Sequence, residues 1–374
     1  MVKITPFVPK EPLVKEPKKT QYSYSRLDKY VECGYKYKLV YEDRNFISET
    51  GVAAAVGTLV HYIEETIANH IIKGEKIDYE ALKKEFYEIN IPEKTPEYDA
   101  EGHKKKGSEG GIYGVKILQS KYQKEFFELD ANGSSYFSKC EEYRQNLIYR
   151  LERRMKENPN LEIIGVEVEF FVDYIGRLIH GYIDRVLFDH DTNEYILEDI
   201  KTKGKPFPDN KLKTPLQFVV YSIAAKKLYG LVDYPTRFYY DLPFCDMLQQ
   251  AGTAGVMNRG FKKLDSTFAG IEAKEFKPGP SPLCHWCEFS PTNPDQPEAG
   301  RGLCPYYSLW DTEGKHKAWE TAHKWEGPER HEAIMDEFRR EMGEPNTPLQ
   351  VMRDFDFQET PQTPAKSPYG DFDF

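Results

Sequence analysis

The chain has 374 residues, of which 39% are hydrophobic and 30% are charged, a composition typical of a globular protein with its own hydrophobic core. The longest stretch without Asp, Glu, Lys or Arg is the fourteen residues 50–63, which excludes a conventional membrane-spanning helix. The net charge of −10 gives no overall attraction to nucleic acid. Any contact with DNA must therefore be local or pass through a bound cation.

The first residues contain lysines and prolines but no apolar segment of the kind found in secretory signals. We therefore expect a cytoplasmic protein, in the cytoplasm of the host if the protein is viral. In a reducing compartment the six cysteines are expected to bind metal or act in catalysis rather than to form disulfides.

Residues 1–21 are rich in lysine and proline, and we interpret them as a flexible basic arm. Apolar residues at helical spacing then predict a short helix that leads into Cys33 and a second helix over about 54–73 that ends at Gly74. The pattern stays mostly helical over the following segment, which we interpret as a helical insertion at about 75–160.

From about residue 161 the pattern changes to short β-branched and aromatic runs separated by turn residues, the signature of a β-meander. A helix over 215–229 and a strand over 236–242 follow, which predicts an α/β catalytic core over about 161–245 with a central mixed sheet flanked by helices. A cysteine-rich closing segment at 278–305 completes one domain over 22–310. Helices over 311–344 come next.

The last segment, 345–374, is acidic and is expected to be disordered when the protein is alone. It contains the tetrapeptide Asp-Phe-Asp-Phe twice, at 354–357 and 371–374. Such a tail could dock on a basic pocket of a replication protein, remain a solvated tail without a partner, or occupy the protein's own basic groove.

The strongest chemical signal is a pair of carboxylates in the predicted hairpin. If the turn is centred between Asp191 and Thr192, the residue numbers of two positions that face each other sum to 383. Asp184 then lies opposite Asp199. Two carboxylates that face each other across a ladder repel unless a cation lies between them. Lys201 shares their face of the strand pair.

Hard oxygen ligands suit Mg²⁺ or Mn²⁺, which also bind phosphate oxygens. The pattern therefore predicts phosphodiester hydrolysis, in which the metal activates a water while Lys201 positions that water or stabilises the developing negative charge. The alternative is an exposed hairpin in which Asp184 and Asp199 pair with Arg185 and Lys201.

The sequence Gly181-x-x-Asp184-Arg185, followed by Asp199-Ile200-Lys201-Thr202, resembles the core of the PD-(D/E)XK nucleases. It is most similar to the RecB-type branch, which includes CRISPR-associated and AddB-like exonucleases of phages and bacteria. Two further motifs match in order: the segment that ends at His61 resembles the helical histidine motif of that branch, and Gln217-x-x-x-Tyr221 resembles its motif on the helix after the sheet.

The resemblance implies a restriction-endonuclease-like core in which a metal is held by His61, Asp184, Asp199 and Ile200. It also implies that the catalytic residues are Asp184, Asp199, Lys201, Gln217 and Tyr221. Both Glu167 and Glu169 lie on the preceding strand, where the branch often carries a carboxylate. We select Glu169, either as an additional metal ligand or as a residue that contacts the ligands.

Cys284 and Cys287 form a C-x-x-C knuckle, and Cys304 follows after sixteen residues. Iron–sulfur nucleases of the RecB type resemble this chain in having one cysteine before the core and three after it. The resemblance therefore implies that Cys33, Cys284, Cys287 and Cys304 hold a [4Fe–4S] cluster that closes the domain like a clasp. The competing interpretation is zinc bound by three cysteines and His285.

We therefore expect a metal-dependent DNA exonuclease acting in replication, recombination or repair. Basic residues that follow the catalytic strand, such as Lys203, and those at Arg150, Arg153 and Arg154 are candidate phosphate contacts or solvated positions. Two alternatives remain: a structure-specific or flap endonuclease with the same site, and a catalytically idle DNA-binding assembly factor.

Overall fold

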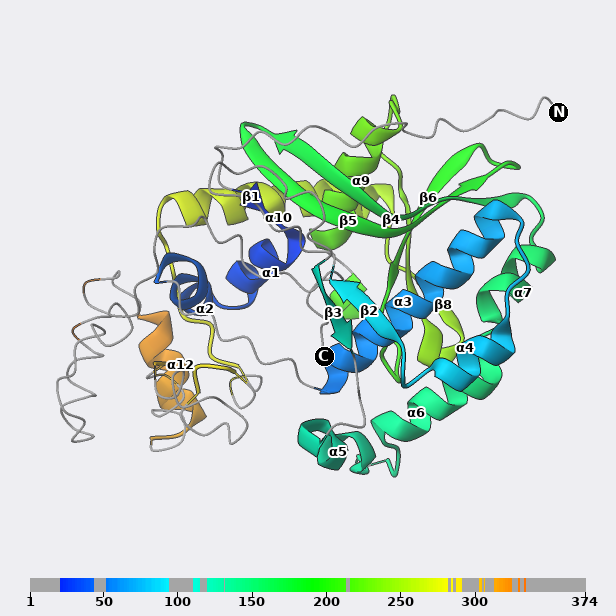
Figure 1. Ribbon diagram of the computed structural model, residues 1–374. Coiled ribbons are helices and arrows are strands. Elements are labelled where there is room, and N and C mark those ends of the chain that lie inside the picture. The colour runs from blue at the N-terminus through cyan, green and yellow to red at the C-terminus, as the bar shows by residue number, and fades with distance from the viewer. Residues whose placement is uncertain are drawn as a thin grey trace. The chain divides into compact units, whose positions relative to one another are not determined.

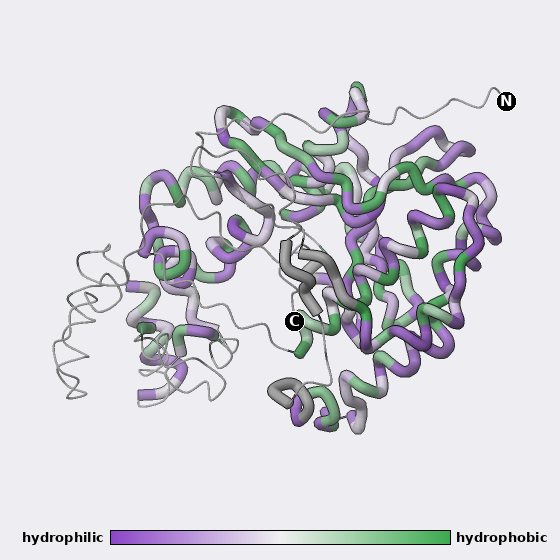
Figure 2. Tube along the Cα trace, viewed as in Figure 1, coloured by the Kyte–Doolittle hydropathy of each residue, from purple (hydrophilic) through white to green (hydrophobic). Residues whose placement is uncertain are grey.

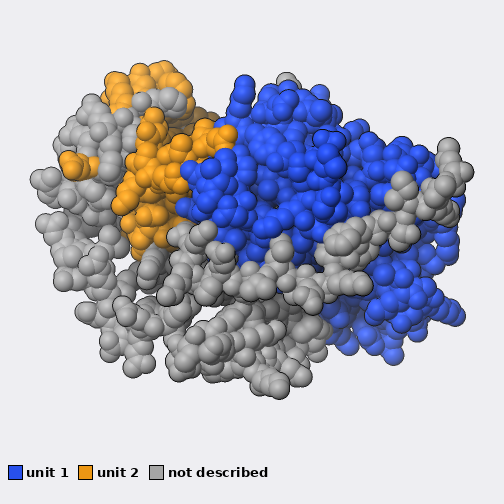
Figure 3. Space-filling view, turned by 90° about the horizontal axis from the view of Figure 1, so that it is seen from above, with its two compact units in different colours: residues 1–24, 50–264, 365–374 blue, residues 25–49, 265–364 orange. Residues whose placement is uncertain are grey.

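The structure is a computed structural model in which the described residues are 21–43, 52–93, 110–114, 120–130, 132–212, 216–281, 284, 287–290, 303–304, 306, 313–324, 329 and 333. The expected arm, apart from residue 21, and the acidic tail at 345–374 lie outside them. Two compact units are present (Figure 3): unit 1 contains the described residues of 1–24 and 50–264, and unit 2 those of 25–49 and 265–364. None of the helices in the described ranges is long and apolar enough to cross a membrane.

Unit 1 is built on a six-stranded mixed sheet in the order β1-β5-β6-β7-β8, with β4 paired to β5. β1 pairs with β5 in parallel, as β6 does with β7, and the other pairs are antiparallel. The strands are β1 (Gln21–Tyr22), β4 (Leu161–Tyr174), β5 (Arg177–Asp189), β6 (Glu194–Ile200), β7 (Arg237–Leu242) and β8 (Met247–Gln250). The expected mixed sheet is therefore confirmed.

Two hairpin turns fix the register of the long central strands, which are drawn in green in Figure 1. In the first, Tyr174 pairs with Arg177, and the two turn residues between them have positive φ values, of which Gly176 at 79° adopts this conformation at little cost. In the second, Arg185 pairs with Glu198, which is the register that places Asp184 opposite Asp199.

Two helices cover opposite faces of the sheet, α3 (Val52–Lys73) and α9 (Leu216–Leu228) (Figure 1). Asp199 and Glu198 are neighbours in β6, so their side chains point to opposite faces. Asp199 contacts α9 through Gln217, whereas Glu198 bonds to Arg185, which also contacts Glu64 of α3. The expected second helix ends as predicted, since Gly74 follows it with φ of 66°.

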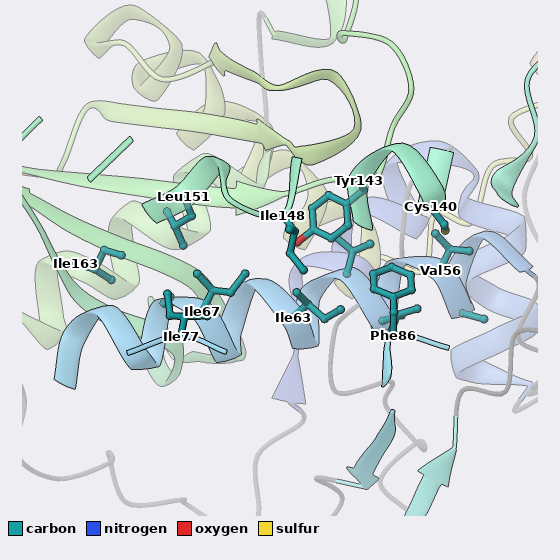
Figure 4. Close-up of a cluster of buried hydrophobic side chains, with 14 of the residues drawn as sticks. Val56, Ile63, Ile67, Ile77, Phe86, Cys140, Tyr143, Ile148, Leu151 and Ile163 are labelled. Carbon is teal, nitrogen blue, oxygen red and sulfur yellow. The ribbon is translucent and has the colours of Figure 1, made fainter. Parts of the chain in front are cut away.

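A hydrophobic core of unit 1 surrounds α3. Figure 4 shows side chains of this helix, such as Ile63 and Ile67, meeting Tyr143, Leu151 and Ile163 from the helices that follow and from β4. In Figure 2 the short outer helices α4 (Tyr79–Glu85) and α7 (Arg150–Glu157) are largely hydrophilic, as expected for helices that cover one edge of this core. The helix that carries His61 is therefore held rigidly against the sheet.

The expected helical insertion contains the helices α4 (Tyr79–Glu85), α5 (Ser120–Phe127), α6 (Tyr136–Glu142) and α7 (Arg150–Glu157), with a π-helical turn at Tyr143–Leu147. The mostly helical pattern did not indicate β2 (Asn90–Glu93) and β3 (Gly110–Gly114), which form an antiparallel pair within the segment. Pro92 and three glycines in β3 are poor helix formers, which accounts for the strands.

The remaining elements of unit 1 are short: α8 (Asp209–Leu212) and a 3₁₀ turn at Pro243–Cys245. α10 (Ala254–Glu272) begins in unit 1 and ends in unit 2. The other elements of unit 2 are α1 (Tyr24–Glu32, from Ser25 onward), α2 (Gly34–Tyr37), a π-helical turn at Lys38–Glu42 and α12 (Lys315–His323). Of the helices expected over 311–344, α12 is the element that falls within the described residues.

Candidate metal centre and cysteine cluster

Three side chains from three elements of unit 1 form a candidate metal centre. His61 from α3, Glu167 from β4 and Asp184 from β5 each place one ligand atom within 4.8 Å of the others. His61 Nδ1 lies 3.9 Å from Glu167 Oε1 and 3.8 Å from Asp184 Oδ2. Donors to one small divalent ion, each about 2.1 Å from it, lie about 3 to 4 Å apart, so these separations suit a shared cation.

The ring of His61 is oriented by a backbone group of the catalytic strand. Its Nε2 lies 2.9 Å from the carbonyl oxygen of Ile200, and because a carbonyl can only accept, Nε2 carries the hydrogen. In the neutral ring Nδ1 then presents its lone pair toward the two carboxylates. A histidine that ligates a metal commonly donates its other N–H to a backbone carbonyl in this way.

A break in the ladder at Glu167 brings its side chain into the centre. Val166 pairs with Arg185 and Val168 with Ile183, so Glu167 lies opposite Asp184, and its φ of 46° departs from strand geometry. Irregular residues of this kind often re-aim a side chain beside an active site. The sequence contains one signal that could have identified Glu167: a hairpin turn centred on residues 175 and 176 gives the register in which Glu167 faces Asp184.

Glu169, which we selected from the sequence, does not belong to the group of three. Its Oε1 accepts hydrogen bonds from Tyr182 Oη at 3.0 Å and from His180 Nε2 at 2.9 Å. His180 is in turn stacked on Phe171, with ring centroids 4.1 Å apart. The structure thus brings Glu167 to the candidate centre and ties Glu169 to a neighbouring polar pair.

Asp199 is held beside the centre by α9 and by its own strand. Its Oδ1 accepts hydrogen bonds from Gln217 Nε2 and, at 3.3 Å, from Tyr221 Oη. Its Oδ2 faces Lys201 Nζ at 3.2 Å, and the Lys201 backbone N–H donates to the carbonyl of Asp241 at 2.8 Å. The Gln217-x-x-x-Tyr221 motif and the Asp199-Ile200-Lys201 motif, which we expected to act together, therefore meet at the Asp199 carboxylate.

Burial sets the electrostatics of the two aspartates, which are 8% and 1% exposed, so the alternative of an exposed hairpin is wrong. The pKa of Asp199 is raised to about 7, chiefly by burial; the nearby Asp184 carboxylate adds to the increase, whereas Lys201 and His61 oppose it. Burial likewise raises the pKa of Asp184, with Glu167 adding to the effect. Burial would lower the pKa of His61, but Asp184 and Glu167 raise it above its ordinary value.

The donor chemistry of the centre fits a divalent cation. The Asp184 carboxylate is buried beside that of Glu167, which raises the pKa of Asp184, and a bound cation would remove the cost of ionising it there. Two carboxylates and one imidazole suit Mn²⁺ or Mg²⁺, and the imidazole favours Mn²⁺ of the two. The Ile200 carbonyl, also expected as a ligand, lies against Nε2 of His61, on the other side of the ring from Nδ1.

The four cysteines of the predicted clasp line one cavity of about 70 Å³ in unit 2, together with residues such as Tyr35 and Phe289. Gly34 allows its walls to meet, because a Cβ there would lie 2.8 Å from the backbone of Lys277. The structure therefore brings Cys33, Cys284, Cys287 and Cys304 together, including the last one with its long spacing. His285, the alternative ligand, lies outside the described residues.

Backbone N–H groups point at the sulfurs of this cavity. Cys33 Sγ accepts from Gly279 N at 3.2 Å and from Lys36 N at 3.4 Å, and Cys284 Sγ accepts from Ser281 N at 3.3 Å. Burial nevertheless raises the pKa of Cys33, that of Cys287 to about 12, and that of Cys304 well above its usual range. Thiolates at these positions would require a bound metal.

The sequence profile of the PD-(D/E)XK nuclease superfamily matches residues 21–292. This range includes the strands, the two flanking helices and every residue of the candidate metal centre. No curated protein matches the sequence. Since the match spans more than two-thirds of the 374 residues and carries the metal-binding arrangement, the chain belongs to the PD-(D/E)XK nuclease superfamily.

Proposed function

We propose that this protein is a Mg²⁺- or Mn²⁺-dependent DNA exonuclease of the RecB type. The observation that carries the proposal is the convergence of His61, Glu167 and Asp184 beside Asp199, which faces Lys201. Helix α3 supplies the histidine, and the β4–β5 hairpin, much later in the sequence, supplies Glu167 and Asp184. The chain belongs to the PD-(D/E)XK nuclease superfamily.

In this proposal His61, Glu167 and Asp184 would hold the metal, which would supply a Lewis acid for a phosphate oxygen and for a water at this position. Lys201 positions the attacking water or stabilises negative charge that develops on the phosphate. Gln217 and Tyr221 hold Asp199 by hydrogen bonds to one oxygen, so that its other oxygen faces Lys201. Apart from Glu167, which is partly exposed, the side chains named here are buried, and this limits their contact with bulk water.

We further propose that unit 2 holds a [4Fe–4S] cluster bound by its four cysteines. Zinc thiolates at about 2.3 Å from one ion lie about 3.8 Å apart, whereas the thiolates of a four-iron cluster bind different irons and lie farther apart. Among the described residues, which include all four cysteines, no three of these sulfurs lie within 4.8 Å of one another. That spread favours a cluster over zinc, and its role would be structural.

The acidic tail at 345–374 lies outside the described residues, and its docking on a replication protein stays part of the proposal. Deletion of residues 358–374 tests it: the nuclease activity on naked DNA should be unchanged, and co-purification with replication proteins should weaken. Faster cleavage would instead indicate self-inhibition by the tail.

The decisive experiment for the function compares linear and covalently closed circular DNA, single- and double-stranded, with Mg²⁺ or Mn²⁺. We expect end-labelled linear DNA to be degraded from its ends while circles stay intact. Cleavage of circles would move the assignment to an endonuclease, and absence of cleavage of every substrate with both metals would overturn the nuclease proposal. Asp199→Asn, prepared in parallel, controls for contaminating nucleases.

A further inference from the structure

A buried ionic network lies on the face of β6 opposite Asp199. It contains three acidic and three basic side chains: Glu64, Glu198, Asp241, Arg150, Arg154 and Arg185. All except Arg154 are at most 5% exposed. The opposite charges are equal in number, and Tyr143 Oη adds a hydrogen bond to Glu64 Oε1 at 2.8 Å.

Arg185 contacts all three acidic members of the network, and they lie on three different elements. Its Nε donates to Glu198 of β6 at 2.8 Å, and one terminal nitrogen donates to Glu64 of α3 at 3.3 Å. The other terminal nitrogen donates to Asp241 of β7. Nε and both terminal nitrogens of Arg185 therefore donate hydrogen bonds, and they link α3, β6 and β7 to β5, the strand that carries Arg185.

Each partner is next to a residue of the candidate metal centre. Glu198 precedes Asp199, and Glu64 follows His61 by one helical turn on α3. The carbonyl of Asp241 accepts the backbone N–H of Lys201. Arg185 itself follows Asp184.

We propose that Arg185 is a positioning residue for the metal centre, and this inference rests on the proposed nuclease function. By bonding Glu198, Glu64 and Asp241 it fixes the backbones that carry Asp199, His61 and Lys201 relative to Asp184. It touches neither substrate nor metal and acts through these neighbours.

Stability alone does not account for such a network. Buried ion pairs cost desolvation free energy, and apolar side chains of the same volume often stabilise a fold as well or better. What a guanidinium adds is a rigid planar fork that holds several carboxylates at fixed angles, which the ammonium group of lysine does not provide. The geometry of the network therefore serves the site on the other face of β6.

The test is Arg185→Lys, which retains the charge and loses the fork. The matched control is Arg150→Lys, because Arg150 contacts Asp241, Glu64 and the partly exposed Asp246 but not Glu198. In this control Arg185 keeps its bonds to Glu198, Glu64 and Asp241. Manganese affinity is measured by electron paramagnetic resonance of free Mn²⁺, kcat at saturating Mn²⁺, and folding by circular dichroism.

We expect Arg185→Lys to weaken Mn²⁺ binding about 10- to 100-fold and to lower kcat, while Arg150→Lys lowers the melting temperature and retains Mn²⁺ binding close to that of the wild type. Should Arg185→Lys not fold, Glu64→Gln tests the link to His61, since glutamine keeps the side-chain shape and can still accept from Tyr143. It too should weaken Mn²⁺ binding.

Equal Mn²⁺ affinity in the wild type and the folded Arg185 or Glu64 variant would overturn the positioning role and leave the nuclease function standing. Equal loss of affinity in Arg150→Lys would also overturn it, because the network would then act only through stability. A wild-type protein that binds no Mn²⁺ and cleaves no DNA would instead refute the proposed function itself.

Discussion

Glu167 lies opposite Asp184 in the β4–β5 hairpin, and it does so with a φ of 46°. A residue other than glycine in this backbone region costs about 1 to 3 kcal/mol and persists where the surroundings over-determine it. Here the conformation aims a second carboxylate at His61 and Asp184. The positive φ at Glu167 therefore destabilises the hairpin, and the same residue supplies a ligand of the candidate metal centre.

Exchanging Glu167 for Gln should weaken Mn²⁺ binding by at least about 10-fold, because a neutral amide replaces a ligand carboxylate. The matched control is Glu169→Gln, two residues away on the same strand and bonded to His180 and Tyr182. It should bind Mn²⁺ more tightly than the Glu167 variant does. A calorimetric titration of both proteins decides the question, and the reverse order of affinities would remove Glu167 from the centre.

Glu167→Gly should separate stability from function. Glycine adopts positive φ without strain, so the free energy of unfolding should rise by about 1 kcal/mol. Removal of the carboxylate beside buried Asp184 acts in the same direction. The variant should therefore unfold at higher urea concentration than the wild type while losing Mn²⁺ binding; a less stable variant would contradict the strain argument.

Lys201→Met should abolish cleavage and leave metal binding intact. Lys201 faces Asp199 and not the group of three ligands, and loss of one electrostatic donor at a reacting centre costs about 10²- to 10³-fold in kcat. Lys227→Ala, at the exposed end of α9, controls for the general loss of a positive charge. Single-turnover cleavage of labelled DNA measures the effect, and wild-type rates in the Lys201 variant would disprove its catalytic role.

The cysteine cavity leads to a prediction about iron. Anaerobically purified protein should be brown, absorb at roughly 400 nm and contain about four irons per chain. Cys304→Ser should lose the iron, because that thiol lines the cavity. Cys245→Ser should retain it, since Cys245 lies in unit 1 and donates to the carbonyl of Lys203. Stoichiometric zinc without iron in the wild type would favour the zinc alternative.

The sequence was sufficient where a local rule determines the geometry. The period of two in a strand and a turn of known centre place Asp184 opposite Asp199, and the observed pairing of Arg185 with Glu198 has that register. Glycine at position 74 ends α3 as expected, because its φ is positive. These features depend on residues close together in the chain.

Features that depend on distant residues were not predictable in this way. Arg150 and Arg154 were candidates for phosphate contacts, yet Arg150 pairs with Asp241, 91 positions away, and Arg154 pairs with Glu198. A basic helix in the sequence is the same whether it faces solvent or buried carboxylates. The choice of Glu169 over Glu167 did not anticipate the group of three for another reason. The sequence does not reveal the φ of 46° at Glu167, the irregular backbone angle of the residue that joins His61 and Asp184.

The ionic network also predicts how stability depends on pH. Burial alone would raise the pKa of Asp241, but Arg150 and Arg185 lower it to about 2 in the folded protein. An unfolded aspartate titrates near 3.9, so the folded state holds the ionised form more strongly by about 2 kcal/mol. This stabilisation is present above pH 4 and is lost as the pH falls from 4 toward 2. Urea unfolding of unit 1, followed by tyrosine absorbance between pH 6 and pH 3, should show the loss begin. Asp241→Asn should be less stable at pH 6 and should lose less free energy of unfolding over the same range, because asparagine does not titrate. Parallel pH profiles for the two proteins would show that Asp241 is not held in its ionised form by the two arginines.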